Sequence, residues 1–269
     1  MTGSTKIYSG TEIAFKYLNY ARRASNGRGH GIHSPFVYEF VSELLNDPRA
    51  YYPFSAIEDL RLAMKKDRRI ITVEDYGKSS GLNKEMSVSA IARRALSTRK
   101  FGQLLFRIVN HYQPKNIIEL GTSLGISGAY LASPDPDSRL ITLEGSTAIA
   151  QIAKENFKKI NLNNIRQVIG NFDETLGRTI QSTPPADLVY IDGNHRKELL
   201  LHYFQQFMNK RSPDAIFILH DIHWSRGMEE AWKIIKDHEE VMLSIDLFSA
   251  GLIFFRNSFR VKQHFIIRF

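Results

Sequence analysis

From residue 116 onward, short apolar runs alternate with amphipathic segments. Seven runs read as strands: NIIEL, RLITLE, IRQVIG, ADLVYID, AIFILHD, VMLSIDLF and GLIFFR. The longer intervening segments, such as RKELLLHYFQQFMNK, have apolar residues at helical spacing. Alternating strands and helices favour a parallel sheet covered by helices on both faces. The short connection Ser249-Ala250 requires the last two strands to be antiparallel. The pattern predicts an α/β fold with a doubly wound, mostly parallel sheet of seven strands and one antiparallel strand near the C-terminus.

The first hundred residues follow a helical pattern instead. TEIAFKYLNYARRA is a helix candidate, and Ser34-Pro35 supplies an N-cap and a first-turn proline for FVYEFVSELL. Ser55 and Glu58 have the spacing of a capping box, and Ser87 and Thr98 are expected to cap two further helices. The polar stretch TVEDYGKSSGLNKEMS reads as turns. We therefore expect a helical N-terminal region over residues 1–97, which provides a lid, substrate contacts or dimer contacts, and an α/β domain over residues 98–269.

Composition and charge narrow the function classes. The 269 residues include no cysteine, which excludes disulfides, thiolate metal sites and a cysteine nucleophile. The start MTGSTKIYSG lacks a signal-peptide pattern and no apolar run reaches membrane-spanning length, so a cytoplasmic protein is expected. Residues 1–100 hold 17 Lys+Arg and 10 Asp+Glu, so most of the net charge of +8 lies there. This excess suits either an anionic partner or a solvated basic surface.

The stretch NIIELGTSLGISGAYLA has the form of a strand, a glycine turn and a helix start. Such turns let the backbone approach a ligand closely and direct free N–H groups at it. Counted from Gly121, the dinucleotide fingerprint would need glycine where Ser123 and Ile126 stand, which disfavours a pyrophosphate-bearing dinucleotide. Glu119, just before the turn, would repel a pyrophosphate but suits a cofactor with an ammonium group. Glu144 ends the next strand, where a carboxylate can accept both hydroxyls of a ribose.

Four segments in order, ELGTSLGIS, LITLEGS, VIGNFDETL and LVYIDGNH, resemble the successive motifs of class I S-adenosylmethionine-dependent methyltransferases. The similarity covers roughly residues 98–256 and is closest to the catechol and caffeoyl-CoA O-methyltransferase group. It implies a Rossmann-like fold with S-adenosyl-L-methionine as the cofactor. It also implies that the methionine moiety lies near Glu119, the ribose near Glu144 and the adenine near Asn171-Phe172. The full set of cofactor-binding residues implied is Glu119, Gly121, Thr122, Ser123, Gly125, Ser127, Glu144, Gly145, Asn171, Phe172 and Asp192.

The acceptor side is predicted at the carboxyl ends of the fourth and fifth strands. Asp192-Gly-Asn-His195 and His220-Asp-Ile-His223 follow these strands, so their side chains are expected to converge near one mouth. A histidine, His195 or His223, suits a general base, and a carboxylate pair instead suits a divalent metal that acidifies a hydroxyl. In the metal-dependent members of the resembled group, an Asn follows the second Asp. Here that position is Ile222, so Asp192 and Asp221 are the candidate ligands of a metal that the sequence leaves open. His223, one residue further, is a substitute ligand that would favour a transition metal.

The expected catalytic residues are therefore Asp192, His195, Asp221 and His223, acting on a hydroxyl of a small molecule. The histidine loop at residues 28–36, with Arg28, His30 and His33, is either a polar loop or a lid for an anionic acceptor. A nucleic-acid (RNA) methyltransferase that uses the basic N-terminal region is the alternative, although IDGNH differs from the turn usual in enzymes that methylate base amines. A non-catalytic S-adenosylmethionine-binding protein and aminopropyl transfer are further alternatives. The identity of the acceptor and the oligomeric state, a homodimer included, stay open.

Overall fold

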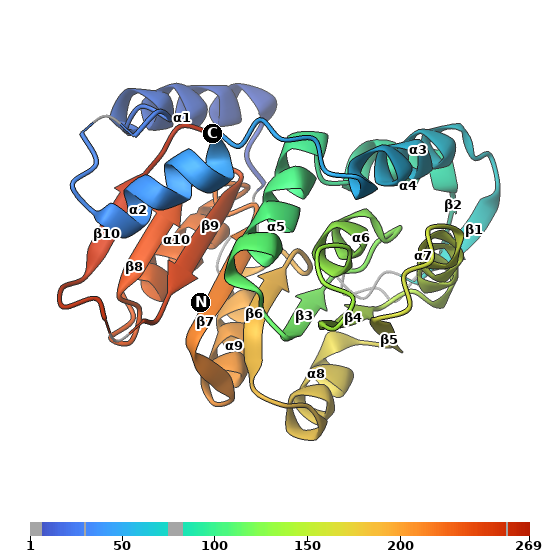
Figure 1. Cartoon of the computed structure of the whole chain (residues 1–269). Coiled ribbons are helices and arrows are strands. Elements are labelled where there is room, and N and C mark those ends of the chain that lie inside the picture. The colour runs from blue at the N-terminus through green and yellow to red at the C-terminus, as the bar shows by residue number, and fades with distance from the viewer. Residues whose placement is uncertain (1–6, 30, 75–82, 257) are drawn as a thin grey trace. The chain divides into compact units, whose positions relative to one another are not determined.

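A computed structural model describes residues 7–29, 31–74, 83–256 and 258–269 (Figure 1). The chain divides into two compact units. One comprises Met1–Asp47 and Pro184–Phe269, and the other Pro48–Thr183. These units differ from the predicted division between residues 97 and 98, which as a functional division stays a prediction.

The unit Pro48–Thr183 is built around three parallel strands in the order β3-β4-β5. These are β3 (Asn116–Leu120), β4 (Arg139–Glu144) and β5 (Ile165–Ile169). The helices of the unit are α3 (Pro53–Lys66), α4 (Val88–Ala95), α5 (Arg99–Tyr112), α6 (Ile126–Ala132), α7 (Thr147–Lys159) and α8 (Phe172–Ser182). Leu120, Leu140 and Leu143 are fully buried, so the apolar runs that predicted these strands form the core here.

A two-stranded antiparallel ribbon is the element that sequence reasoning missed in this unit. β1 (Ile70–Val73) pairs with β2 (Lys84–Ser87) in a stretch that we expected to consist of turns. β1 is apolar apart from Thr72 but is only four residues long, and β2 is mostly polar. Neither strand is buried, so the pair lacks the longer apolar pattern that reveals a buried strand. The remainder of the expected turn, residues 75–82, lies outside the described residues.

The other unit contains five strands in the order β10-β8-β9-β7-β6. They are β6 (Ala186–Ile191), β7 (Arg211–His220), β8 (Leu243–Asp246), β9 (Ala250–Phe254) and β10 (Gln263–Ile266). β9 runs antiparallel to both neighbours, β7 and β8, whereas the β6–β7 and β8–β10 pairs are parallel. This confirms the predicted mostly parallel sheet with one reversed strand near the C-terminus. Helices α9 (Lys197–Met208) and α10 (Arg226–Lys236) connect the strands (Figure 1).

The expected strand count of seven is corrected by the C-terminal segment. Among the described residues, the two units together hold eight strands in addition to the two strands of the β1–β2 ribbon. The additional strand is β10, which pairs in parallel with β8 from Gln263↔Leu243 to Ile266↔Asp246. It is only four residues long and partly exposed, so its sequence pattern was too short to separate it from a tail.

Three helical segments open this unit: α1 (Gly10–Arg23), α2 (Pro35–Glu39) and the π-helix η1 (Phe40–Leu45). Ser9 and Glu12 form a reciprocal capping box at the start of α1. Phe36 and Phe40 pack edge-to-face on Phe254 of β9, which ties α2 and η1 to the strands. None of the described helices is both long and apolar enough to cross a bilayer.

Candidate active site

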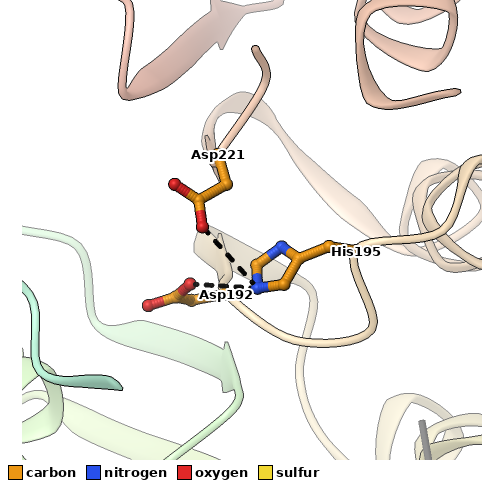
Figure 2. Close-up of side chains that lie close together, drawn as sticks. All are labelled: Asp192, His195 and Asp221. Atoms are coloured by element: carbon orange, nitrogen blue, oxygen red, sulfur yellow. Dashed lines mark ion pairs between the residues drawn. The ribbon is translucent and has the colours of Figure 1, made fainter. Parts of the chain in front are cut away.

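Four acidic and imidazole side chains meet at the carboxyl ends of β6 and β7. Figure 2 shows three of them, Asp192, His195 and Asp221. His195 Nε2 lies 4.0 Å from Asp192 Oδ1 and 3.8 Å from Asp221 Oδ2. His220 Nδ1 lies 3.1 Å from Asp192 Oδ1 and 3.4 Å from Asp221 Oδ1. The predicted convergence of the two segments therefore holds for these four residues. Parallel neighbouring strands explain it, because their carboxyl ends share one edge.

The two histidines of this group differ in exposure and charge. Burial alone would lower the pKa of His220, but the charges and hydrogen bonds of Asp192 and Asp221 outweigh it and raise the pKa to about 10. Burial would raise the pKa of Asp221, but His220 and His195 lower it. His220 is therefore an imidazolium at neutral pH and fixes the two carboxylates. The His195 side chain, 32% exposed, is the more accessible imidazole.

Neighbouring side chains orient this group further. The Tyr190 hydroxyl donates to Asp192 Oδ2 over 2.8 Å, and Asn194 Nδ2 donates to the Tyr203 hydroxyl over 2.9 Å. Sequence reasoning missed Tyr190, although alternation along a strand places it on the same side as Asp192. It named His220 as one of the three histidines but assigned it no role.

His223 belongs to a different polar cluster. Its Nε2 lies 2.9 Å from Asp246 Oδ2 and its Nδ1 lies 2.9 Å from Glu229 Oε1. Burial would lower its pKa, but the two carboxylates raise it to about 9. An imidazole with both nitrogens bound to carboxylates is poorly prepared to accept a proton or ligate a metal. The catalytic role of His223 stays a prediction that this geometry does not favour.

The donor set near Asp192 fits a divalent metal. One ligand atom each from Asp192, His195 and Asp221 lie within 4.8 Å of one another. The third donor is therefore His195 rather than the expected substitute His223. Ile222, which stands at the asparagine position of the resembled group, is fully buried. An imidazole beside two carboxylates suits Mn²⁺, Fe²⁺ or Zn²⁺ better than Mg²⁺.

In the unit Pro48–Thr183, the glycine turn follows β3. Gly121, Ser123 and Gly125 all have positive φ, at 101°, 46° and 87°. A Cβ at Gly125 would lie 2.8 Å from a Phe157 ring atom, so both the conformation and the space require glycine there. The turn is thus a tightly packed strand-to-helix connection, as predicted.

Glu144 lies beside this turn. Its Oε2 accepts a hydrogen bond from the Ser123 N–H over 2.8 Å, and its Oε1 accepts one from the Ser146 N–H over 3.1 Å. Burial, opposed by these hydrogen bonds, raises the pKa of the Glu144 carboxyl. A half-buried carboxylate with acceptor capacity left on both oxygens gains from hydroxyl donors. The position therefore fits a ribose.

The other predicted cofactor residues of this unit are more enclosed. Glu119 is fully buried, and its Oε2 accepts a hydrogen bond from the Thr142 hydroxyl over 2.6 Å. Thr122 and Ser127 are also buried, and Asn171 caps α8 by accepting from the Asp173 N–H. Phe172 is only 8% exposed. The cofactor contacts of these residues, and of Gly121, Gly145 and Asp192, stay predictions.

The histidine loop before α2 is partly described. Arg28 and His33 are exposed, and the Arg28 N–H donates to Asn26 Oδ1. His30 lies outside the described residues. The proposed lid role of this loop stays a prediction.

Comparison with known proteins shows what this chain is similar to. Residues 118–222 match a family model described as a methyltransferase domain. A catechol O-methyltransferase of Niastella koreensis is 31% identical over 126 residues, which cover 46% of this chain and 55% of that protein. The chain thus spans about half the length of this curated relative.

Solved structures share the fold at lower identity. An O-methyltransferase from Bacillus cereus, in complex with S-adenosylhomocysteine, has a TM-score of 0.57 at 20% identity and covers 81% of this chain and 97% of its own. The S-adenosylhomocysteine-bound methyltransferase PaMTH1 of Podospora anserina has a TM-score of 0.60 at 15% identity and covers 95% and 100%. The chain therefore shares the α/β fold of these methyltransferases, and its residues 118–222 are similar to a methyltransferase domain.

Proposed function

We propose that the protein is an S-adenosylmethionine-dependent methyltransferase that methylates a hydroxyl of a small molecule. The observation that carries the proposal is the placement of His195 Nε2 between Asp192 and Asp221, at 4.0 and 3.8 Å. The match to a methyltransferase domain and the similarity to a catechol O-methyltransferase support the same chemistry.

On the acceptor side, His195 takes the proton of the acceptor hydroxyl. The carboxylates of Asp192 and Asp221 stabilise the imidazolium that forms, as acids do beside catalytic histidines. The hydroxyl oxygen then forms a bond to the methyl carbon while the carbon–sulfur bond breaks. S-adenosylmethionine, when bound, would supply this methyl group, and the sulfur would keep the bonding electrons as the thioether of S-adenosylhomocysteine. His220, held as an imidazolium by the same carboxylates, keeps the two acids in place.

On the cofactor side, the turn after β3 would hold S-adenosylmethionine, and Glu144 would accept the ribose hydroxyls. The Ser123 N–H, already bonded to Glu144, fixes the orientation of the carboxylate for this task. The bound analogues in the solved structures of similar fold support this choice of cofactor.

A metal gives the same site a second route to an activated hydroxyl. Asp192, His195 and Asp221 would hold the ion, which when bound supplies Lewis-acid activation of the hydroxyl. The excess of positive charge in the first hundred residues and the exposed Arg28 suit an anionic acceptor. A homodimer is compatible with the proposal.

The test is methyl transfer from S-adenosylmethionine to a panel of catechols, phenols and carboxylate-bearing phenols, read as S-adenosylhomocysteine formation. We expect turnover with at least one hydroxyl acceptor and a loss of at least 100-fold in His195→Ala. His202→Ala, an exposed histidine on α9, is the matched control. Parallel assays with EDTA, and with EDTA followed by Mn²⁺ or Mg²⁺, distinguish the two routes. Full activity in EDTA excludes the metal route, and transfer only to RNA would overturn the small-molecule assignment.

A further inference from the structure

The loop between β7 and α10, residues 221–225, carries Asp221 in a conformation that the rest of the fold must hold. Asp221 has φ 56°, in the left-handed region that non-glycine residues seldom adopt. Its N–H donates to the Ser249 carbonyl over 2.6 Å, and its own carbonyl accepts from the Trp224 N–H over 3.0 Å. Such a conformation persists only where the surroundings determine it.

His223 connects this loop to two other elements. Its imidazole bridges Asp246, at the end of β8, and Glu229, in the first turn of α10, with both distances at 2.9 Å. The same ring stacks on Phe248, with centroids 5.2 Å apart and an interplanar angle of 23°. The side chain is 20% exposed. The contacts of His223 with Asp246, Glu229 and Phe248 therefore suit a structural link between the loop, β8 and α10 rather than a reactive group.

Glu229 connects His223 to the N-terminal segment. Its Oε2 accepts from the Tyr8 hydroxyl over 2.8 Å, and the Lys16 ammonium donates to both carboxylate oxygens over 2.8 and 2.9 Å. The backbone continues the contact, because the Tyr8 N–H donates to the Trp224 carbonyl over 3.2 Å. Ile7 also forms an antiparallel bridge with Ser225. Residues 7 and 8 thus lie along the loop that carries Asp221.

Helix α1 packs on Phe248, the residue on which the His223 ring stacks. The Tyr17 and Tyr20 rings pack on Phe248 at centroid distances of 5.1 and 5.2 Å. Phe248 has φ 67°, so it too is held in the left-handed region. The N-terminal segment therefore contacts the loop that carries Asp221, and α1 contacts Phe248, a second residue in the left-handed region.

We infer that His223 and Glu229 are positioning residues for the proposed methyl transfer, and that Tyr8 and Lys16 complete their support. Together they hold the loop so that the Asp221 carboxylate faces His195 and Asp192. The inference rests on the proposed function, but its structural part makes a claim that can be measured without turnover. It also gives the N-terminal helix a task other than a lid.

The structural arm is amide hydrogen exchange of the full-length protein. In Glu229→Gln and Tyr8→Phe, we expect exchange of residues 221–225 to accelerate at least 10-fold. Glu230→Gln is the matched control, since Glu230 is the next residue of α10 and pairs only with surface Lys197 and Arg226 among its described ion pairs. If exchange in the loop is the same in Glu229→Gln as in Glu230→Gln, the inference is overturned, whatever the activity assay gives.

The functional arm is a double-mutant cycle with Asp221→Asn, which retains a side chain that tolerates the left-handed conformation. We expect His223→Gln to lower kcat 10- to 100-fold in the native background while the dissociation constant for S-adenosylhomocysteine changes less than 2-fold. In the Asp221→Asn background, the same substitution should change kcat less than 2-fold, because its effect passes through Asp221. Equal losses in both backgrounds would show a general structural role and overturn the positioning claim. His202→Gln controls for loss of an imidazole.

If the wild-type protein methylates no acceptor, the proposed function fails while the exchange result still decides the positioning claim. If activity is present and loop exchange is unchanged, only the positioning claim fails.

Discussion

At the scale of single residues, two of the capping signals were read correctly, whereas one capping box and the longer-range partners were not. Ser87 and Thr98 cap their helices by accepting from the Ala90 and Phe101 N–H groups, as their sequence positions predicted. Ser55 and Glu58 were read as a capping box, but α3 already begins at Pro53, which corrects that prediction.

Glu58 instead binds side chains that its spacing could not reveal. It accepts from Arg61 and from the Tyr130 hydroxyl, 72 positions along the chain. A cap depends on three or four neighbouring residues, so it is visible in a window of sequence. A partner 72 residues away is not.

Glu144 gives the first prediction at this scale. Glu144→Gln removes the charge that a ribose would meet, and we expect the affinity for S-adenosylhomocysteine to fall at least 10-fold. Isothermal titration calorimetry on the purified protein measures this directly. Glu155→Gln, at a half-buried carboxylate on α7 that pairs with Arg69, is the control and should leave the affinity unchanged. Unchanged affinity in Glu144→Gln would rule out the ribose role.

Gly125 gives a second prediction. Its φ of 87° and the 2.8 Å approach of Phe157 leave no room for a methyl group. Gly125→Ala should therefore lower the free energy of unfolding by about 2–3 kcal/mol, from backbone strain and overpacking. Denaturant unfolding measures the change. Gly10→Ala, where an added Cβ meets nothing within 4 Å, should shift the free energy by less than about 0.5 kcal/mol.

At the scale of elements, the strands and helices from Asn116 to Phe254 follow the periodicity that predicted them. The spacing of apolar residues in these segments marks the face that is buried, so it indicates both the type and the place of each element. The ribbon of β1 and β2 and the edge strand β10 were not predicted, since each of these strands is only four residues long and none is fully buried. His223 shows the same limit within the candidate site. Its spacing placed it beside Asp221, but its imidazole is bound by Glu229 and Asp246, which only the packing of α10 and β8 brings together.

The link between α1 and α10 makes stability depend on acid pH. Burial would raise the pKa of Glu229, but His223, Lys16 and Tyr8 lower it from 4.5 to about 2. A depressed carboxyl pKa contributes stability that is present above pH 4.5 and lost as the pH falls toward 2.

We therefore expect Glu229→Gln to lower the free energy of unfolding at pH 7 by on the order of 2 kcal/mol. The difference from the wild type should shrink across the window from pH 4.5 to 2. Urea unfolding at pH 7, 4.5 and 3 measures it, with Glu230→Gln as the exposed control. A difference that does not change with pH would contradict the assignment of the shift to Glu229.

At the scale of the whole molecule, the two ends of the described chain meet within one unit. The Ser25 N–H donates to the Ile266 carbonyl, the Arg268 N–H donates to the Ser25 carbonyl, and the Tyr20 hydroxyl donates to the Ile267 carbonyl. The C-terminal strand β10 therefore fixes the end of α1 as well as extending the strands from β8.

Deletion of residues 263–269 should lower Tm by at least 5 °C and promote aggregation, because it removes these hydrogen bonds and uncovers the edge of β8. Differential scanning fluorimetry and light scattering measure the two effects. Val261→Ser, at a side chain 63% exposed just before β10, should change neither. A truncated protein with the wild-type Tm would show that α1 and β8 need no support from this strand.

The left-handed backbone at Asp221 places two demands on one position. Chemistry at the site calls for a carboxylate, whereas the backbone favours glycine or asparagine. Directed evolution that selects only for thermal stability is therefore expected to replace Asp221 with Asn or Gly. Such a substitution would relieve the backbone strain but remove one of the two carboxylates beside His195. At Asp221, the stability of the fold and the proposed catalytic role therefore favour different residues.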